Sequence, residues 1–330
     1  MYKHLFIEFI IGLGAAFLLT VVLSHYIIPV LKGHKVGQSI RAEGPSWHMS
    51  KAGTPTMGGI CFIMAMLFVA AGFTVYYALG NRQSELIPLA LTLGLAVFNG
   101  MLGFVDDYCK LLKKENEGLT IKQKLFLEFV VAIIYVAALA FTGYLDTTLN
   151  IPFLGVEFEL GWLYYVFAVL LIVGMVNGVN FTDGLDGLAS SVTLVVAGFF
   201  AFVAFNCMNS SLVLISSVLL GGMIGFLIFN FHPAKVFMGD TGSLFLGGIV
   251  TGMAFLINDP LIIVITGGIY VFELFSVAIQ ILSFKLFKKR VFKMAPVHHH
   301  FEKCGWGEVK VVSVFTLVTL VLSVIAWFAI

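Results

Sequence analysis

Five aspartates lie just beyond the ends of long apolar segments: Asp106, Asp107, Asp183, Asp186 and Asp240. Only 11% of the residues are charged, so the placement of these carboxylates is informative. An acidic side chain at the edge of a hydrocarbon layer is costly unless it faces water, a cation or a partner, and such groups therefore indicate function. The lysines nearby in the sequence supply only part of the counter-charge. The pattern predicts a bound divalent cation.

The first two of these aspartates are adjacent, within residues 102–110. Neighbouring residues on a helix point about 100° apart, so Asp106 and Asp107 should converge on one point only if the helix ends there. One carboxylate would then face a metal or an acidic proton while the other orients it. The alternative is a solvated helix end, although a helix C-terminus favours cations over two acids.

The densest polar stretch is residues 177–187. It carries Asn177, Asn180, Asp183 and Asp186 at intervals of three, with glycines between them and no basic residue. Glycine lets backbone N–H groups approach a ligand closely. The stretch lacks the twelve-residue ligand pattern and the closing Glu of a calcium-binding EF-hand. A plain turn between two membrane helices needs neither amides nor acids so densely, so we predict a functional site here.

A third acidic stretch, residues 230–243, places Asp240 just before a Gly-Ser helix start. One alternative is that Asp240 only caps this helix. Mg²⁺ usually takes one or two protein carboxylates together with phosphate oxygens. Asp240 therefore fits a magnesium ion bound with a diphosphate substrate.

Two further stretches carry groups suited to phosphate. Three histidines occupy 298–300 in a basic loop, and because further zinc ligands are missing, we expect imidazoles that donate to phosphate oxygens or relay protons. Residues 51–59 combine Lys51 with threonines and glycines, which either hold a phosphate or form a structured entry turn, but they are not a Walker A loop. The four scattered cysteines indicate neither a disulfide framework nor a zinc site.

The elements that must position these residues are membrane helices. With 60% hydrophobic residues and a mean hydropathy of +1.02, the chain lacks the polar residues of a water-soluble exterior. Runs of about 20 apolar residues cross the roughly 30 Å hydrocarbon layer. We expect the first run to be a retained helix, because no small-residue cleavage site follows it. The sequence predicts an all-α polytopic membrane protein, a single domain over 1–330, with ten spans at 5–31, 58–79, 86–105, 125–143, 161–179, 187–206, 211–230, 243–257, 260–284 and 309–329.

The basic residues set the predicted orientation. With the N-terminus outside, 17 of the 19 Lys and Arg residues fall on the inner side, and only Lys3 and Arg82 fall outside. The positive-inside rule then makes both termini external and all five aspartates cytoplasmic. The net charge of +1 and the absence of a basic tail give no sign of nucleic-acid binding.

Two segments depart from plain spans and loops. Within the outside linker 144–160, residues 156–160 alternate apolar and acidic side chains after Pro152 and Gly155, which predicts a small external β-hairpin. The ninth span contains Gly267 and Gly268 together with Glu273 and Gln280. We expect a bent or broken helix whose second half leaves the bilayer, and the alternative is one tilted helix with Glu273 facing the bundle.

Taken together, these stretches resemble the polyprenyl-phosphate N-acetylhexosamine-1-phosphate transferases over nearly the whole chain. The sequences at 54–59 and 296–302 are similar to the members that use a muramoyl-pentapeptide donor. The chain departs from that pattern at Phe181, where Leu is usual, at Val314 and Thr316, where Arg and Trp are expected, and in the loop before Lys51. None of these departures touches an aspartate.

The resemblance implies transfer of phospho-MurNAc-pentapeptide from UDP-MurNAc-pentapeptide to undecaprenyl phosphate. This reaction forms lipid I and UMP at the cytoplasmic face of the bacterial inner (plasma) membrane, with Mg²⁺ as cofactor. The resemblance leaves open whether the chain forms a homodimer. The implied catalytic residues are Asp106, Asp107, Asp183 and His298, with Asp240 and Asp183 as metal ligands. The implied substrate-binding residues are Lys51, Lys122, Asn177, Asn180, Asp186, Asn230, Phe237, Gln280 and His299, with Phe237 stacking on uracil.

Three other functions compete with this interpretation. A relative that transfers phospho-GlcNAc would run the same chemistry with another donor. An ion-coupled transporter would want its carboxylates near mid-membrane and reachable from both sides, whereas here they gather at one face. A structural lipid-binding subunit would not need the amide, hydroxyl and carboxylate groups that lie so close together in residues 180–187. For the chemistry itself, we favour direct attack by the lipid phosphate, with Asp106 as base or orienter, over a covalent enzyme intermediate.

Overall fold

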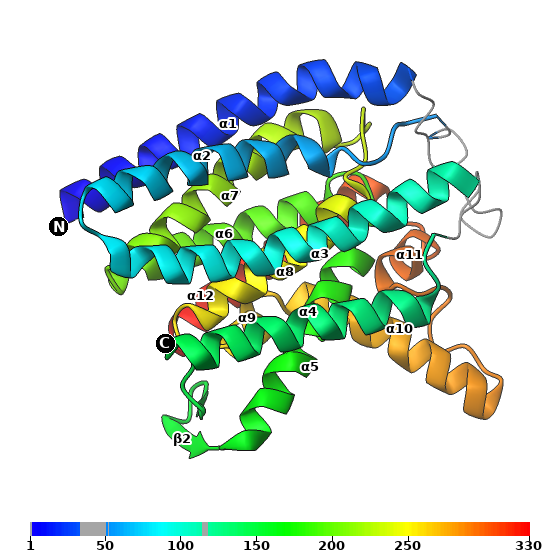
Figure 1. Cartoon of the computed structure of the whole chain (residues 1–330). Coiled ribbons are helices and arrows are strands. Elements are labelled where there is room, and N and C mark those ends of the chain that lie inside the picture. Colours follow the sequence, from blue (N-terminus) through cyan, green and yellow to red (C-terminus); the bar gives the residue numbers. More distant parts are fainter. Residues whose placement is uncertain (1, 34–50, 52, 114–117) are drawn as a thin grey trace.

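The computed structural model describes residues 2–33, 51, 53–113 and 118–330, which form a bundle of helices with one small hairpin (Figure 1). The loop before Lys51, where the sequence departs from the pattern it resembles, lies outside the described residues. Within them, nine helices are long and apolar enough to cross a membrane. These nine are α1 (Tyr2–Gly33), α2 (Gly59–Leu79), α3 (Leu86–Lys113), α4 (Ile121–Thr142), α5 (Trp162–Thr182), α6 (Leu188–Asn206), α7 (Ser210–Asn230), α10 (Gly268–Phe287) and α12 (Glu308–Trp327).

The eighth predicted span is a shorter, central helix, α8 (Gly239–Phe255). Its 17 residues make it about 26 Å long, less than the roughly 30 Å of hydrocarbon. Every residue from Thr241 to Phe255 is buried, so α8 is enclosed by its neighbours. The other short elements are a 3₁₀ turn (Gln83–Glu85), α9 (Ile262–Thr266) and α11 (Val297–Glu302).

Small residues allow α8 to pack tightly against its neighbours. A Cβ added at Gly248 would lie 2.9 Å from Cα of Ala96 on α3, and one at Gly247 would lie 2.6 Å from Cα of Val176 on α5. Backbones that approach this closely are typical of helix packing in membranes, where small residues replace the hydrophobic driving force. α8 is therefore held at fixed depth and rotation between α3 and α5.

The outer surface of the bundle is apolar. Phe68 on α2, Phe141 on α4 and Trp162 on α5 are all more than two-thirds exposed. A contiguous apolar surface of this kind is rare on soluble monomers and marks contact with lipid or a partner. The prediction of an all-α polytopic membrane protein is confirmed.

Both predicted irregularities are present. β1 (Thr148–Ile151) pairs antiparallel with β2 (Val156–Glu159), with Thr148 opposite Glu159, so the hairpin is confirmed. The ninth predicted span is interrupted at Gly267, which ends α9 and precedes α10. In Figure 1, α10 runs obliquely and its C-terminal end projects beyond the other helices.

The two ends of the bundle differ in content. The N- and C-termini and the hairpin lie at one end in Figure 1. The C-terminal end of α3, the N-terminal end of α4 and the short helix α11 lie at the opposite end. All five of the aspartates singled out from the sequence belong to segments at that opposite end.

Candidate active site

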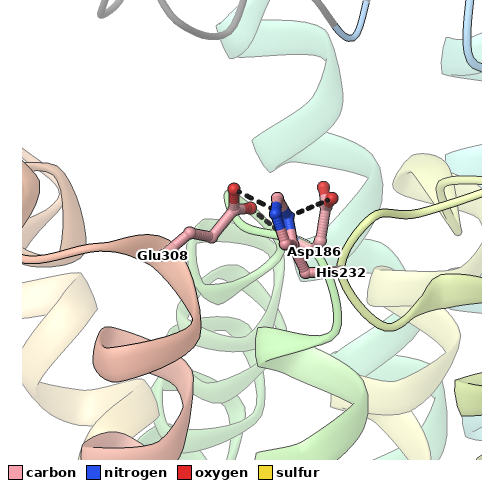
Figure 2. Close-up of side chains that lie close together, drawn as sticks. All are labelled: Asp186, His232 and Glu308. Carbon is pink, nitrogen blue, oxygen red and sulfur yellow. Dashed lines mark hydrogen bonds and ion pairs between the residues drawn. The ribbon is translucent and has the colours of Figure 1, made fainter.

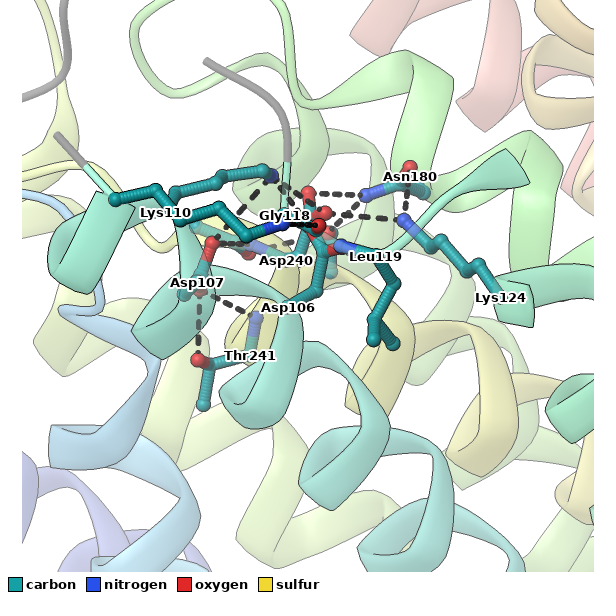
Figure 3. A network of polar contacts seen from close by, with 12 residues as sticks. Asp106, Asp107, Lys110, Gly118, Leu119, Lys124, Asn180, Asp240 and Thr241 are labelled. Atoms are coloured by element: carbon teal, nitrogen blue, oxygen red, sulfur yellow. Dashed lines mark hydrogen bonds and ion pairs between the residues drawn. The ribbon is translucent and has the colours of Figure 1, made fainter. Parts of the chain in front are cut away.

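Asp240, in the first turn of α8, is where three other helices meet (Figure 3). Its Oδ2 accepts hydrogen bonds from the Nζ atoms of Lys110 on α3 (2.9 Å) and Lys124 on α4 (3.0 Å). Its Oδ1 accepts from the Nδ2 of Asn180 on α5 (2.9 Å). One carboxylate therefore receives two cations and an amide, each from a different helix.

Asp106 and Asp107 both reach this centre although the helix does not end beside them. α3 continues to Lys113, eight residues beyond the predicted end of the span at residue 105. Asp106 Oδ2 lies 2.6 Å from Lys110 Nζ, and its Oδ1 accepts the N–H of Leu119 at 2.7 Å. The two side chains converge because α8 begins against this turn of α3, where its backbone N–H groups contact Asp107 and the side chain of Asp240 contacts Asp106.

Asp107 caps the start of α8. Its Oδ2 accepts from the backbone N–H of Thr241 (2.9 Å) and from its hydroxyl (2.7 Å), and its Oδ1 accepts the N–H of Asp240 (3.2 Å). The first N–H groups of a helix have no partner within the helix and need one from outside. The residue before α8, Met238, makes no side-chain cap, so the cap comes from Asp107 on α3.

A glycine makes this approach possible. A Cβ added at Gly103 on α3 would lie 2.1 Å from the carbonyl oxygen of Asp240. Real Cβ atoms are never this close to a backbone oxygen, so any side chain at position 103 would push α8 away. Gly103 therefore fixes the distance between the Asp106–Asp107 pair and Asp240.

The residues at this centre fit a hard divalent cation. Asp106, Asp107 and Asp240 each offer a carboxylate oxygen, and these atoms lie within 4.8 Å of one another. Carboxylate oxygens are the protein ligands that Mg²⁺ prefers. Lys110 and Lys124 supply two positive charges against three carboxylates, so the cluster keeps a surplus of negative charge. Asp183, predicted as a second metal ligand, is not part of this group.

Asp183 follows the last residue of α5 and is half-buried. Burial raises the pKa of its carboxyl well above the usual value, and the negative charges of Asp240, Asp107 and Asp186 act in the same direction. The site therefore disfavours a further negative charge on this side chain unless a cation is close.

A second cluster forms around Asp186 (Figure 2). Its Oδ1 lies 2.6 Å from Lys51 Nζ, and its Oδ2 accepts from the N–H of Ala234 at 2.9 Å and lies 3.0 Å from His232 Nδ1. Glu308, at the start of α12, contacts Lys51 and accepts the backbone N–H of Asp186 at 2.7 Å. This cluster joins four segments that are distant in the sequence.

The charge of Lys51 controls the ionisation of this cluster. Burial alone would raise the pKa of Asp186, but the hydrogen bonds from Lys51, Ala234 and His232, together with the positive charge of Lys51, bring that pKa below its usual value. Asp186 is therefore an anion at neutral pH, and Lys51 is tied to it. Lys51 and Asp186, both predicted to bind substrate, are brought into direct contact.

Asn230 and Phe237 hold the loop before α8. Asn230 is buried, accepts from the Ser190 hydroxyl at 2.8 Å and donates to the carbonyl oxygen of Val236 at 3.0 Å. The backbone N–H of Phe237 donates to the carbonyl oxygen of Pro55 at 2.8 Å. The segment after Lys51 therefore runs beside this loop, and the Phe237 side chain stays partly exposed next to it.

The remaining predicted residues divide between buried and exposed positions. Asn177 donates to Glu128 on α4 and to the carbonyl oxygen of Val173 (2.9 Å), which places it between two helices. Gln280 bonds to the backbone of Val291 and Phe292, so its amide holds the loop after α10. Lys122 is exposed at the start of α4, and His299 lies 2.7 Å from Glu302.

Four residues of the two clusters were not singled out from the sequence, Lys110, Lys124, His232 and Glu308, and neither was Glu128, the partner of Asn177. Lys110 had a local signal, because it stands three and four residues after the aspartate pair on one helix. Glu308 had none, since its partners Lys51 and Asp186 are 257 and 122 residues away.

Comparison with known proteins gives consistent matches. The family model described as Glycosyl transferase family 4 matches residues 89–258. The model described as Phospho-N-acetylmuramoyl-pentapeptide-transferase signature 1 matches residues 51–63, the segment that carries Lys51. The first match covers slightly more than half of the chain.

Three relatives with the name phospho-N-acetylmuramoyl-pentapeptide-transferase are similar over almost the full length. The protein of Acetivibrio thermocellus is 46% identical over 318 residues, covering 95% of this chain and 93% of the relative. That of Clostridium perfringens is 44% identical over 321 residues, covering 97% and 98%. That of Bacillus subtilis is 43% identical over 310 residues, covering 94% of both. The chain belongs to the phospho-N-acetylmuramoyl-pentapeptide transferases of glycosyl transferase family 4.

Proposed function

We propose that this chain transfers phospho-MurNAc-pentapeptide from UDP-MurNAc-pentapeptide to undecaprenyl phosphate, forming lipid I and releasing UMP in peptidoglycan synthesis. The observation that carries the proposal is the convergence of Asp106, Asp107 and Asp240 with Lys110 and Lys124 at one end of a membrane bundle. One substrate is a lipid anchored in the bilayer and the other is a soluble nucleotide. A charged site at the membrane boundary is what this pair of substrates requires.

The reaction requires the protein to position the substrates more than to form a covalent bond with them. An oxygen of the lipid phosphate attacks the phosphorus that carries the sugar, a new P–O bond forms, and the bond to the bridging oxygen breaks. UMP leaves with that electron pair. A phosphate monoester has a second pKa of about 6 and is already largely anionic near pH 7, so the attack needs little help from a base. Neutralising and aligning the phosphates is the main task.

The residues of the first cluster are suited to that task. We assign Asp240, with Asp106 and Asp107, to Mg²⁺, which when bound would neutralise charge on the phosphate oxygens. Lys110 and Lys124 would add two fixed positive charges beside them. Asp106 already holds Lys110 and the backbone of Leu119, which supports a role as orienter over a role as base. Asp183 would stand next to the reacting phosphates.

We assign the second cluster to the donor nucleotide. Asp186 and Asn230 would hold uridine and Phe237 would stack on uracil, because these three residues adjoin one loop. Lys51 would contact phosphate. Lys122, Asn177, Asn180, Gln280 and His299 stay assigned to phosphate, sugar or supporting contacts. His298 stays a predicted catalytic residue that would contact phosphate or sugar.

We further propose that the site faces the cytoplasm, with both termini and the hairpin outside the plasma (inner) membrane. The support is the sequence itself, in which 17 of the 19 Lys and Arg residues fall in the loops assigned to the inner side.

The deciding measurement is UMP release from UDP-MurNAc-pentapeptide and undecaprenyl phosphate by the purified chain in detergent. We expect turnover that needs Mg²⁺ and stops when the metal is chelated. UDP-GlcNAc should not replace the muramoyl donor. Turnover of UDP-GlcNAc without turnover of the muramoyl donor would overturn the proposal in favour of the related phospho-GlcNAc transferases.

A further inference from the structure

Glu273 and His298 form a buried pair that the roles above leave unexplained. Glu273 lies on α10, just beyond the break at Gly267, and is 0% exposed, while His298 on α11 is 1% exposed. Glu273 Oε1 lies 3.0 Å from His298 Nδ1, and Glu273 Oε2 accepts the backbone N–H of Val297 at 2.9 Å. Both oxygens of this carboxylate therefore form hydrogen bonds with residues of α11.

This pairing sets which nitrogen of His298 carries the proton. A carboxylate accepts hydrogen bonds, and the one at Oε2 comes from a backbone N–H, which can only donate. When Oε1 also accepts, the proton of the neutral imidazole stands on Nδ1 and the other nitrogen, Nε2, is a bare acceptor. In serine proteases, too, a buried carboxylate accepts a hydrogen bond from the catalytic histidine and holds it in one tautomer.

The Nε2 atom of His298 is buried and has no hydrogen-bond partner among the described residues. It lies against the loop that carries Asp183 and Asp186, because a Cβ added at Gly184 would be 2.2 Å from it. A buried acceptor without a partner costs about 1–3 kcal/mol. Gly184 itself is exposed, so the atom stands just beneath the surface of the predicted site.

We propose that Glu273 is a positioning residue that holds His298 with its proton on Nδ1 and presents Nε2 to a hydrogen-bond donor of the sugar nucleotide. The class of group that completes the site is therefore an O–H or N–H, such as a sugar hydroxyl or an acetamido N–H, and not a phosphate oxygen. The inference rests on the proposed function. It narrows the part of the donor that His298 is expected to contact, from the phosphates or the sugar to the sugar alone.

The tautomer is tested directly by ¹⁵N NMR of the full chain in detergent with ¹⁵N-labelled histidine and no substrate. The chain has eight histidines, and comparison with His298→Gln assigns the signals of His298. We expect a neutral ring with an unprotonated Nε2. A protonated Nε2 in the wild-type chain, as neutral ring or imidazolium, would overturn the proposal, and this measurement is independent of whether the muramoyl donor is turned over.

Glu273→Gln tests the positioning role. A carboxamide has one acceptor oxygen for two N–H donors, so we expect the His298 signals to change and kcat to fall about 10- to 100-fold, as for other residues that orient an imidazole. The double variant with His298→Gln should then be no slower than His298→Gln alone. Additive losses, or an unchanged NMR signal in Glu273→Gln, would contradict the proposal.

If Glu273→Gln folds poorly, a second variant tests the same proposal. Gly184→Ala leaves Glu273 intact but places a methyl group against Nε2. We expect a loss of kcat with the Nδ1 proton still present. The control for replacing a buried carboxylate is Asp259→Asn, in the turn between α8 and α9, which should leave kcat unchanged. Normal turnover by Gly184→Ala would count against a substrate contact at Nε2.

Discussion

The Asp107 carboxylate on α3 accepts both the backbone N–H and the hydroxyl of Thr241 in the first turn of α8. This contact caps α8 from a neighbouring helix, and it fixes Asp240 one residue earlier in the chain. Asp107 thus has a structural task that its neighbour Asp106 does not share. The geometry of the whole acidic centre depends on the spacing of α3 and α8.

That spacing is tested by Gly103→Ala. The added methyl group would meet the carbonyl oxygen of Asp240, so α8 must shift, and we expect a free energy of unfolding lower by about 1–3 kcal/mol. A displacement of about 1 Å at the centre should lower kcat about 100-fold. Gly94→Ala on the same helix is the control, because nothing lies within 4 Å of a Cβ there. Equal behaviour of the two variants in thermal unfolding and UMP release would refute the close-packing argument.

Asp240→Asn should abolish Mg²⁺-dependent UMP release while the protein stays folded in detergent. The substitution keeps the shape of the side chain but removes the charge that receives Lys110 and Lys124. We expect a loss of about 100-fold or more, the scale seen when one electrostatic contact to a transition state is removed. Asp259→Asn serves again as the control, and retained activity of Asp240→Asn would exclude the metal role.

Phe237→Ala should raise the KM for the donor nucleotide. A stacking contact with a base is worth about 1–3 kcal/mol, so the increase should be about 5- to 150-fold, with a smaller change in kcat. Phe68→Ala on the lipid-facing side of α2 removes a phenyl ring elsewhere and should leave the donor KM unchanged. If steady-state kinetics give Phe237→Ala the wild-type KM, uracil binds elsewhere.

Glu308→Ala should destabilise the protein although Glu308 belongs to the second cluster and not to the group of Asp106, Asp107 and Asp240. The change removes the acceptor for the Asp186 N–H and one partner of Lys51, which together tie α12 to two other segments. We expect the free energy of unfolding to fall by about 1–3 kcal/mol. Glu157→Ala in the exposed hairpin is the control and should have no effect. An unchanged Tm in Glu308→Ala would show that the cluster adds nothing to stability.

Asp259 should make the free energy of unfolding depend on pH. Burial raises the pKa of this carboxyl from 3.8 to about 6, and its Oδ1 has no hydrogen-bond partner among the described residues. Because the folded state binds the proton more tightly than the unfolded state, stability is lost as pH rises from about 4 to about 6. Asp259→Asn should therefore be more stable than wild type at pH 7, by about 1–3 kcal/mol, and equally stable near pH 4. Thermal unfolding across this pH range would measure it, and a variant less stable at pH 7 would contradict the prediction.

The sequence by itself determined the membrane class, nearly all of the helices, the hairpin and the break at Gly267. These features depend on runs of neighbouring residues, because apolar length, strand alternation and paired glycines act locally. It also determined which stretches hold the polar groups, since carboxylates and amides at the ends of apolar runs are rare. The family followed from the same short stretches, before any contact between them was known.

Only the tertiary structure decided which of these groups meet. From the sequence, Asp106 and Asp107 needed a helix end to converge, yet α3 continues to Lys113, and α8 brings their partners to them. Lys124 pairs with Asp240, Glu308 with Lys51, and Glu273 with His298 across 116, 257 and 25 residues. Such pairs depend on how closely helices pack, as at Gly103, and the packing of distant segments leaves no periodic signal in the chain.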